Sequence, residues 1–75
     1  MNAKRRKKLS EVHDQLSSAI VTLEDVIDEE QDSLDNTPEG LQGSAAFAEK
    51  EDTLDDLRDA LDDIKSSAEI VQKYM

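Results

Sequence analysis

Any catalytic chemistry in this chain would have to use His13, because it is the only imidazole and there is no cysteine. A serine nucleophile needs a base held beside it. The four serines in helical patterns have no motif that places such a base: Ser17, Ser18, Ser66 and Ser67. His13 lies at the edge of an apolar helix face, where a partly exposed position in a helix interface is the simpler interpretation. We therefore expect no catalytic residue and no enzymatic activity.

Carboxylates are abundant enough to raise the question of a metal site. Di-metal helical bundles need inward-facing carboxylates with a Glu-x-x-His repeat, whereas Glu30 is the one acidic residue expected between the helices. The acidic run DEEQDSLDNTPE lacks the alternating acids followed by glycine that form an EF-hand loop. Phosphate-binding glycine loops are missing as well. We expect no metal and no cofactor.

The charge of the chain is distributed unevenly along its length. There are 19 acidic and 9 basic residues, which gives a net charge of −10. Residues 24–39 hold eight acids and no base, and residues 49–63 hold eight acids and two bases, so these segments together carry −14. Residues 1–23 carry +3 and residues 64–75 carry +1. A chain folded back at its middle would be a strong electrical dipole.

Two apolar repeats predict the elements that carry these charges. Apolar residues recur every three or four positions in each half, which is typical of amphipathic helices. The first repeat is Leu9, Val12, Leu16, Ala19, Leu23 and Val26, flanked by a second row of Ile20, Ile27 and Leu34. The second repeat is Phe47, Leu54, Leu57, Leu61, Ile64, Ala68, Val71 and Met75, interrupted only at Lys50.

Between the repeats, the segment DNTPEGLQGS contains the only proline and both glycines of the chain. Thr37 and Pro38 can begin a short turn, and PEGLQ is long enough for a single helical turn. Gly40 and Gly43 are expected to supply backbone angles that other residues resist. Ser44 is a suitable N-cap for the second helix.

These features predict an all-α fold with a single domain over residues 1–75. The expected architecture is an antiparallel two-helix hairpin that resembles a coiled coil. Helix one is expected over about 3–35, the turn over about 36–43 and helix two over about 44–74. Leu41, the lone apolar residue of the turn, is expected to plug the end of the core.

The antiparallel pairing can be tested residue by residue. We expect Val26 to face Leu54, and Glu30 to form an ion pair with Lys50 that fixes the register. Beside this interface helix two carries a row of mostly small residues: Ala46, Thr53, Ala60 and Ser67. One layer of two helices leaves a side uncovered. Either two hairpins dimerise into a four-helix bundle, or the free side is offered to a partner.

The charge density at the turn suggests a function. Helices rise about 1.5 Å per residue, so the acidic end spans roughly 20 to 24 Å of the hairpin. It therefore carries one net negative charge per about 1.5 to 1.7 Å of its length. Duplex DNA carries one negative charge per about 1.7 Å of its axis. A rod of similar charge density can compete for Arg and Lys residues in a nucleic-acid groove. The candidate partner-binding residues are Glu24, Asp25, Asp28, Glu29, Asp32, Asp55, Asp56, Asp59, Asp62 and Asp63.

The basic run KRRKK is the opposite electrostatic feature. Without aromatic residues or a reading helix, it would bind nucleic acid only weakly and without sequence preference. The segment that follows this run is amphipathic and charged, whereas a signal peptide has an apolar segment at this position. We therefore expect neither secretion nor a membrane span. The five basic residues are Lys4, Arg5, Arg6, Lys7 and Lys8.

The chain also resembles a family of small acidic proteins of phages and prophages of Gram-positive bacteria. The segments that carry the resemblance are NAKRRKKLSEVHDQL, LEDVIDEEQDSLDNTPEGLQGS and TLDDLRDALDDI, which cover most of the chain. Its most specific part is the turn, with Asn36, Pro38, Glu39, Leu41 and Gln42. The resemblance implies a viral protein made in the bacterial cytoplasm, and it supplies no site residues.

Two hypotheses of function follow from these observations. In the first, the protein is a non-enzymatic phage protein that binds and inhibits a host protein with a basic surface, one that handles nucleic acid or acts in antiviral defence. In the second, it is a self-associating assembly accessory whose acidic faces are only solvated.

Overall fold

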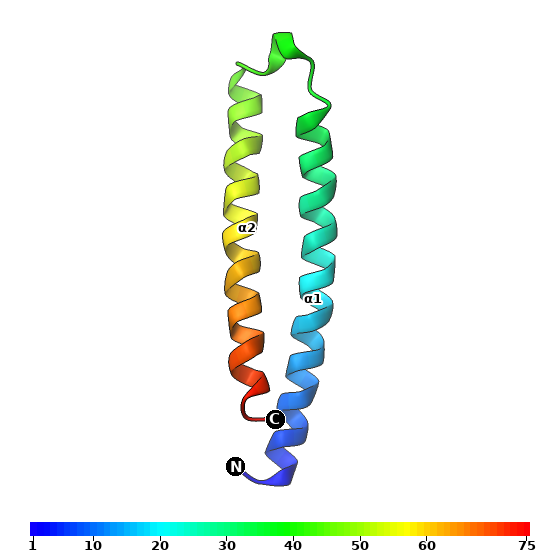
Figure 1. Ribbon diagram of the computed structural model, residues 1–75, viewed down its shortest axis with the longest axis vertical. Helices are drawn as coiled ribbons and strands as arrows, with labels where there is room; N and C mark the ends of the chain where they lie inside the picture. The colour runs from blue at the N-terminus through cyan, green and yellow to red at the C-terminus, as the bar shows by residue number, and fades with distance from the viewer.

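The computed structural model describes residues 1–75 and shows two long helices packed antiparallel (Figure 1). Helix α1 runs over Ala3–Asp35 and α2 over Ala45–Gln72. Between them lies the single 3-10 turn η1, Glu39–Leu41. The Cα atoms extend over 60 × 15 × 12 Å, and both termini lie at the end opposite the bend. The predicted hairpin is confirmed, with α2 ending two residues earlier than expected.

The helix starts are fixed by side-chain caps, as expected from the residue types. Asn2 Oδ1 accepts a hydrogen bond from the Arg5 amide at 2.9 Å, and Ser44 Oγ accepts one from the Phe47 amide at 3.2 Å. Each cap satisfies an amide that has no partner within its own helix. The N-cap role predicted for Ser44 is thus confirmed.

The bend differs from the prediction in two respects. No residue has a positive φ, so Gly40 and Gly43 do not adopt the left-handed conformation that would require glycine. The single helical turn predicted in PEGLQ is confirmed, because Pro38, whose ring fixes φ at −56°, directly precedes the 3-10 turn. Leu41 is 55% exposed, so it does not plug the core. Leu41 lies in the 3-10 turn, beyond the ends of both helices, so neither helix covers its side chain.

Helix α2 buries its predicted row, but the interface of α1 is turned from the predicted phase, so that Val12, Ala19 and Val26 are exposed. Ile27 is 6% exposed and Leu54 1%, whereas Val26 is 43% exposed. The predicted facing of Val26 and Leu54 is therefore wrong. The row predicted as a flank, which includes Ile20 and Ile27, faces α2, because isoleucines bury more apolar surface there than the valines and alanine of the other row would.

The predicted register is wrong as well. Lys50 Nζ donates a hydrogen bond to Ser33 Oγ at 3.1 Å, and no ion pair joins Lys50 to Glu30. Ser33 lies almost one turn closer to the bend along α1 than Glu30 does. The pairing is set by the isoleucine row, not by the ion pair.

The core of this hairpin is thin, since only Ile27, Leu54 and Ala68 are buried. The other interface side chains keep part of their surface in water because a second layer does not cover them. Neither helix is long and apolar enough to cross a membrane.

Candidate protein-binding surface

Three of the predicted acidic residues of α1, Asp25, Glu29 and Asp32, project from the side of the helix that faces away from α2. Asp25 and Asp32 are two turns apart and share one line along the helix. Asp28 and Glu29 lie beside this line, and all four side chains are exposed. These carboxylates are available to a partner without any rearrangement of the hairpin.

Helix α2 carries the other half of the predicted set in the same manner. Two pairs of aspartates, each seven residues apart, form adjacent rows, with Asp59 between them. The residues are Asp55 with Asp62 and Asp56 with Asp63, and all are exposed. Because the interface residues Leu54, Leu57 and Leu61 face α1, these aspartates face outward.

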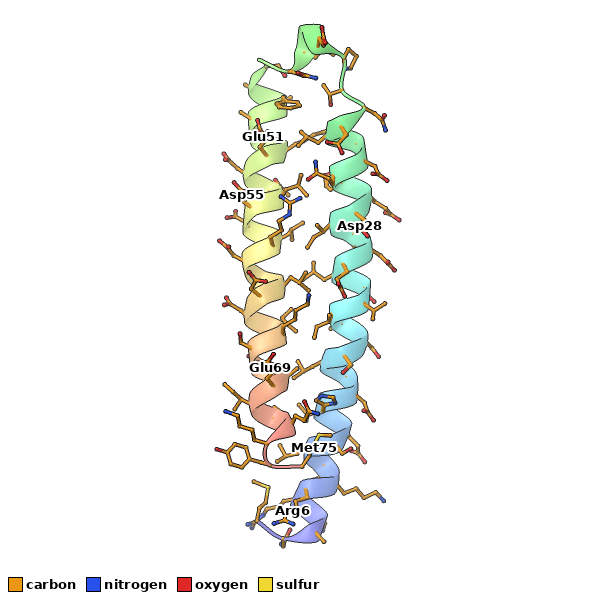
Figure 2. All side chains as sticks on the ribbon, viewed as in Figure 1. Arg6, Asp28, Glu51, Asp55, Glu69 and Met75 are labelled. Carbon is orange, nitrogen blue, oxygen red and sulfur yellow. The ribbon has the colours of Figure 1, made fainter.

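The antiparallel packing brings both acidic groups to the same half of the rod. In Figure 2, Asp28 on α1 and Asp55 on α2 lie in the half nearer the bend, whereas Arg6 lies near the other end. Around the axis of each helix, however, Asp25 and Asp32 point away from α2, and Asp55 and Asp59 point away from α1, so the two groups lie on opposite outer flanks. The predicted residues therefore form two anionic flanks and not one continuous face.

One groove does combine acids from both helices. It has a volume of about 340 Å³, and its floor is formed by Ile27 and Leu61. The residues around it are Glu24 and Asp28 from α1 and Arg58 and Asp62 from α2. Three of the ten predicted residues meet here, and the guanidinium of Arg58 lies among them.

Two polar contacts cross between the helices on the side of this groove. Arg58 Nη2 donates a hydrogen bond to Gln31 Oε1. Lys65 Nζ lies 3.8 Å from Glu24 Oε2 in an ion pair at the surface. Part of the charge of Glu24 is thereby neutralised within the hairpin. Sequence reasoning missed these contacts because the phase of the interface was wrong, and the correct phase places all four side chains beside the core.

The bend contains a second, more apolar hollow, with a volume of about 480 Å³. Its apolar lining comes from Pro38, Leu41, Ala46 and Phe47, and Lys50 stands at its edge. Since Leu41 is mostly exposed, an apolar side chain of a partner can contact it directly. This hollow lies at the acidic end of the rod.

The basic residues lie at the far end, and all five side chains of the run are exposed. Figure 2 shows Arg6 beyond Met75, so the first turns of α1 extend past the end of α2. This basic segment is separated from the acidic flanks by much of the length of the rod.

No three His, Cys, Asp or Glu side chains are placed to hold a metal ion. His13 is half-buried near the termini, and its Nδ1 lies 3.9 Å from Asp14 Oδ1. Comparison of the chain with protein-family models, curated proteins and solved structures finds no match.

Proposed function

We propose that this is a non-enzymatic phage protein that acts in the cytoplasm of its bacterial host, where it binds and inhibits a protein with a basic nucleic-acid-binding groove. The observation that carries the proposal is the meeting of residues 24–39 and 49–63 at one end of the hairpin, with a net charge of −14. The target class is a nucleic-acid-handling or antiviral-defence protein.

The arrangement of the charges, and not only their number, supports mimicry of a DNA duplex. Two anionic flanks, one on each helix, run along a rod whose helices have diameters of about 10 to 12 Å. In DNA, two phosphate backbones border a major groove about 12 Å wide. A groove whose Arg and Lys side chains contact both backbones can contact both flanks, because the charge per unit length is also similar.

Selectivity among basic proteins requires contacts other than charge, since every nucleic-acid-binding groove attracts anions. The apolar hollow at the bend can supply them. Leu41 and Phe47 lie at the acidic end of the rod, where a partner bound to the flanks would also reach the hollow. The resemblance to small acidic phage proteins is strongest at this same turn and supports the proposed viral origin.

The proposal is tested by capture from host lysate followed by release with DNA. Immobilised protein is expected to retain host proteins at about 50 mM NaCl and to lose them at about 500 mM, as surface charge attraction is screened. Duplex DNA added at low salt should release the same proteins. The decisive result is release by duplex DNA at concentrations at which polyglutamate of equal charge does not release the proteins, because only a groove shaped for a duplex distinguishes these two polyanions.

Two triple variants provide the matched comparison. Asp55→Asn, Asp56→Asn and Asp59→Asn remove three charges from one flank and should abolish capture, with helicity by circular dichroism unchanged. Glu11→Gln, Asp14→Asn and Glu69→Gln remove three charges near the termini and should leave capture intact. Equal capture by both variants, or retention in the presence of DNA, would overturn the proposal.

The second candidate function is an assembly accessory that acts through self-association. One observation favours it: the exposed apolar residues Val12 and Val26 lie on a side of the hairpin that has no cross-helix salt bridge. If this function is correct, the protein should form oligomers as its concentration rises. It should capture no host protein that duplex DNA releases.

A further inference from the structure

The two broad sides of the hairpin differ in chemistry. On one side Glu24 and Gln31 of α1 contact Lys65 and Arg58 of α2. In an α-helix each residue turns by about 100°. Val26 is two residues beyond Glu24, so it lies about 200° around α1 and belongs to the opposite side of the hairpin.

The same spacing identifies the residues of that opposite side on both helices. Residues seven apart share a face, so Val12, Ala19 and Ser33 lie in line with Val26. The Lys50 ammonium donates to Ser33 Oγ, so the uncharged stretch ends between Val26 and Ser33, short of the bend. On α2, Ala60 is two residues beyond Arg58, so it also lies on the opposite side of the hairpin. Thr53 and Ser67, seven positions before and after Ala60, lie in line with it. We call the resulting set the uncharged face: Val12, Ala19, Val26, Thr53, Ala60 and Ser67.

The uncharged face is a narrow strip in a chain of which 37% of residues are charged. Asp56 and Asp63 border it on α2, and Glu30 follows Val26 by one turn on α1. Val12 and Val26 are both exposed on the uncharged face, and the exposed Ile70 adjoins it three residues beyond Ser67. The α2 side consists of small residues, which let another helix approach closely. The hairpin alone buries only three residues, so a second layer here would bury apolar surface that the single layer leaves in water.

The size of this side is adequate for a stable interface. The rod measures 60 by 15 Å between Cα atoms in its two longest dimensions. A second hairpin that lies along it covers an area similar to the about 800 Å² per partner of standard protein interfaces. A copy of the same chain offers the same uncharged surface, as a two-fold symmetric interface requires.

Charge decides how two copies would be oriented. If both bends were at the same end, two segments of −14 would lie side by side, within about one helix diameter of each other. This distance is similar to the Debye length of about 8 Å at physiological salt, so the repulsion is only partly screened. In the opposite orientation each −14 end lies beside the terminal ends, which carry +3 and +1.

We propose that two copies dimerise through the uncharged face with their bends at opposite ends, which forms a four-helix bundle. A two-fold axis that reverses the rod places α1 on α1 of the other copy and α2 on α2. Ala19 is the central residue of α1, Ala3–Asp35, so it lies near the axis. Val12 of each copy then lies near Val26 of the other copy.

This dimer is compatible with the proposed function but does not depend on it. Asp25, Asp32, Asp55 and Asp59 lie away from the uncharged face and remain exposed in the dimer, whereas Asp56 and Asp63 lie at its border. Each end of the bundle would then present one pair of acidic flanks beside the basic run of the other copy. Loss of dimerisation leaves the flanks of each hairpin intact, so the two proposals fail independently.

Cysteine cross-linking tests the orientation, because the chain has no cysteine of its own. Ala19→Cys should give covalent dimers with a short bis-maleimide linker. A mixture of Val12→Cys and Val26→Cys chains should give mixed dimers in preference to dimers of either variant. Val21→Cys is the matched control, since it is exposed on the same helix but lies away from the uncharged face, and it should cross-link at least tenfold less.

The orientation with both bends together predicts a different result. There α1 packs on α2 of the other copy, so Ala19→Cys and Val21→Cys would cross-link equally poorly.

Mass by light scattering tests the face itself. The contacts of Glu24 with Lys65 and of Gln31 with Arg58 place Ala19 level with about Ser67, so Ser67→Glu should shift the protein from two chains to one and weaken association at least tenfold, whereas Val21→Glu should not. Circular dichroism confirms that both variants stay helical. A wild-type mass of one chain throughout the micromolar range would overturn the proposal.

Discussion

Val26 and Ile27 are adjacent in the sequence but belong to regions of α1 with different roles. Ile27 is buried against α2, whereas Val26 lies on the uncharged face. Both rows are apolar and both repeat every seven residues, so each is suited to a helix interface. The difference shows that the row with the larger side chains forms the hairpin, and the row with smaller ones remains available for a second contact.

The sharpest way to test this difference is to truncate matched isoleucines. Ile27→Ala should lower the free energy of unfolding by about 2 to 5 kcal/mol, because it removes buried methyl groups and leaves a cavity. Ile70→Ala, at an exposed position, should change it by less than about 1 kcal/mol, since alanine also favours the helix. Urea unfolding followed by circular dichroism, at concentrations where the chain is a monomer, measures both. Equal losses would mean that the interface phase described here is wrong.

The first turn of α2 is held by a side-chain cap. Ser44→Ala removes the oxygen that accepts from the Phe47 amide and should cost about 1 kcal/mol. Ser66→Ala, in an exposed helical position, is the control and should be neutral or slightly stabilising. Thermal unfolding of the two variants gives the comparison. A neutral Ser44→Ala would show that the cap does not contribute to stability.

The bend should accept residues other than glycine. Neither Gly40 nor Gly43 has a positive φ, and a Cβ added to either would meet no atom within 4 Å. Gly40→Ala and Gly43→Ala should each raise the free energy of unfolding by about 0.4 to 1 kcal/mol, because alanine has fewer conformations to lose on folding. A loss of stability in urea unfolding would indicate that the bend uses a left-handed conformation.

The smallest effect is expected on the polar side of the hairpin. The ion pair of Glu24 and Lys65 is about half exposed at both ends. A double-mutant cycle with Glu24→Gln and Lys65→Gln should give a coupling of about 0.2 to 1 kcal/mol that falls as salt is added. Coupling that stays constant at high salt would point to a contact shielded from solvent.

The helix bounds and caps could be predicted because they depend on local residue types. Ser44 at the start of α2 and Pro38 in the bend have strong positional preferences. The interface phase could not be predicted in the same way, since the rows of Val26 and Ile27 are both apolar. The choice between them depends on contacts between residues far apart in the chain.

The candidate site was predictable in composition but not in shape. Counting charges places all ten acids in the half near the bend, and the hairpin confirms that placement. Their division into two flanks depends on the direction of each side chain around its helix. The groove with Arg58 depends on the same side-chain directions. It can be predicted only once the row of α1 that faces α2 is known.

Because the first and last residues lie together at one tip of a slender 60 Å rod, an attachment at either terminus holds the chain by the same tip. A reporter, an affinity handle or a surface anchor fused there would stand far from the hairpin bend. The protein can therefore be immobilised through either terminus with its acidic bend extended into solution. In a binding assay on a sensor surface, the bend would then be accessible to a partner.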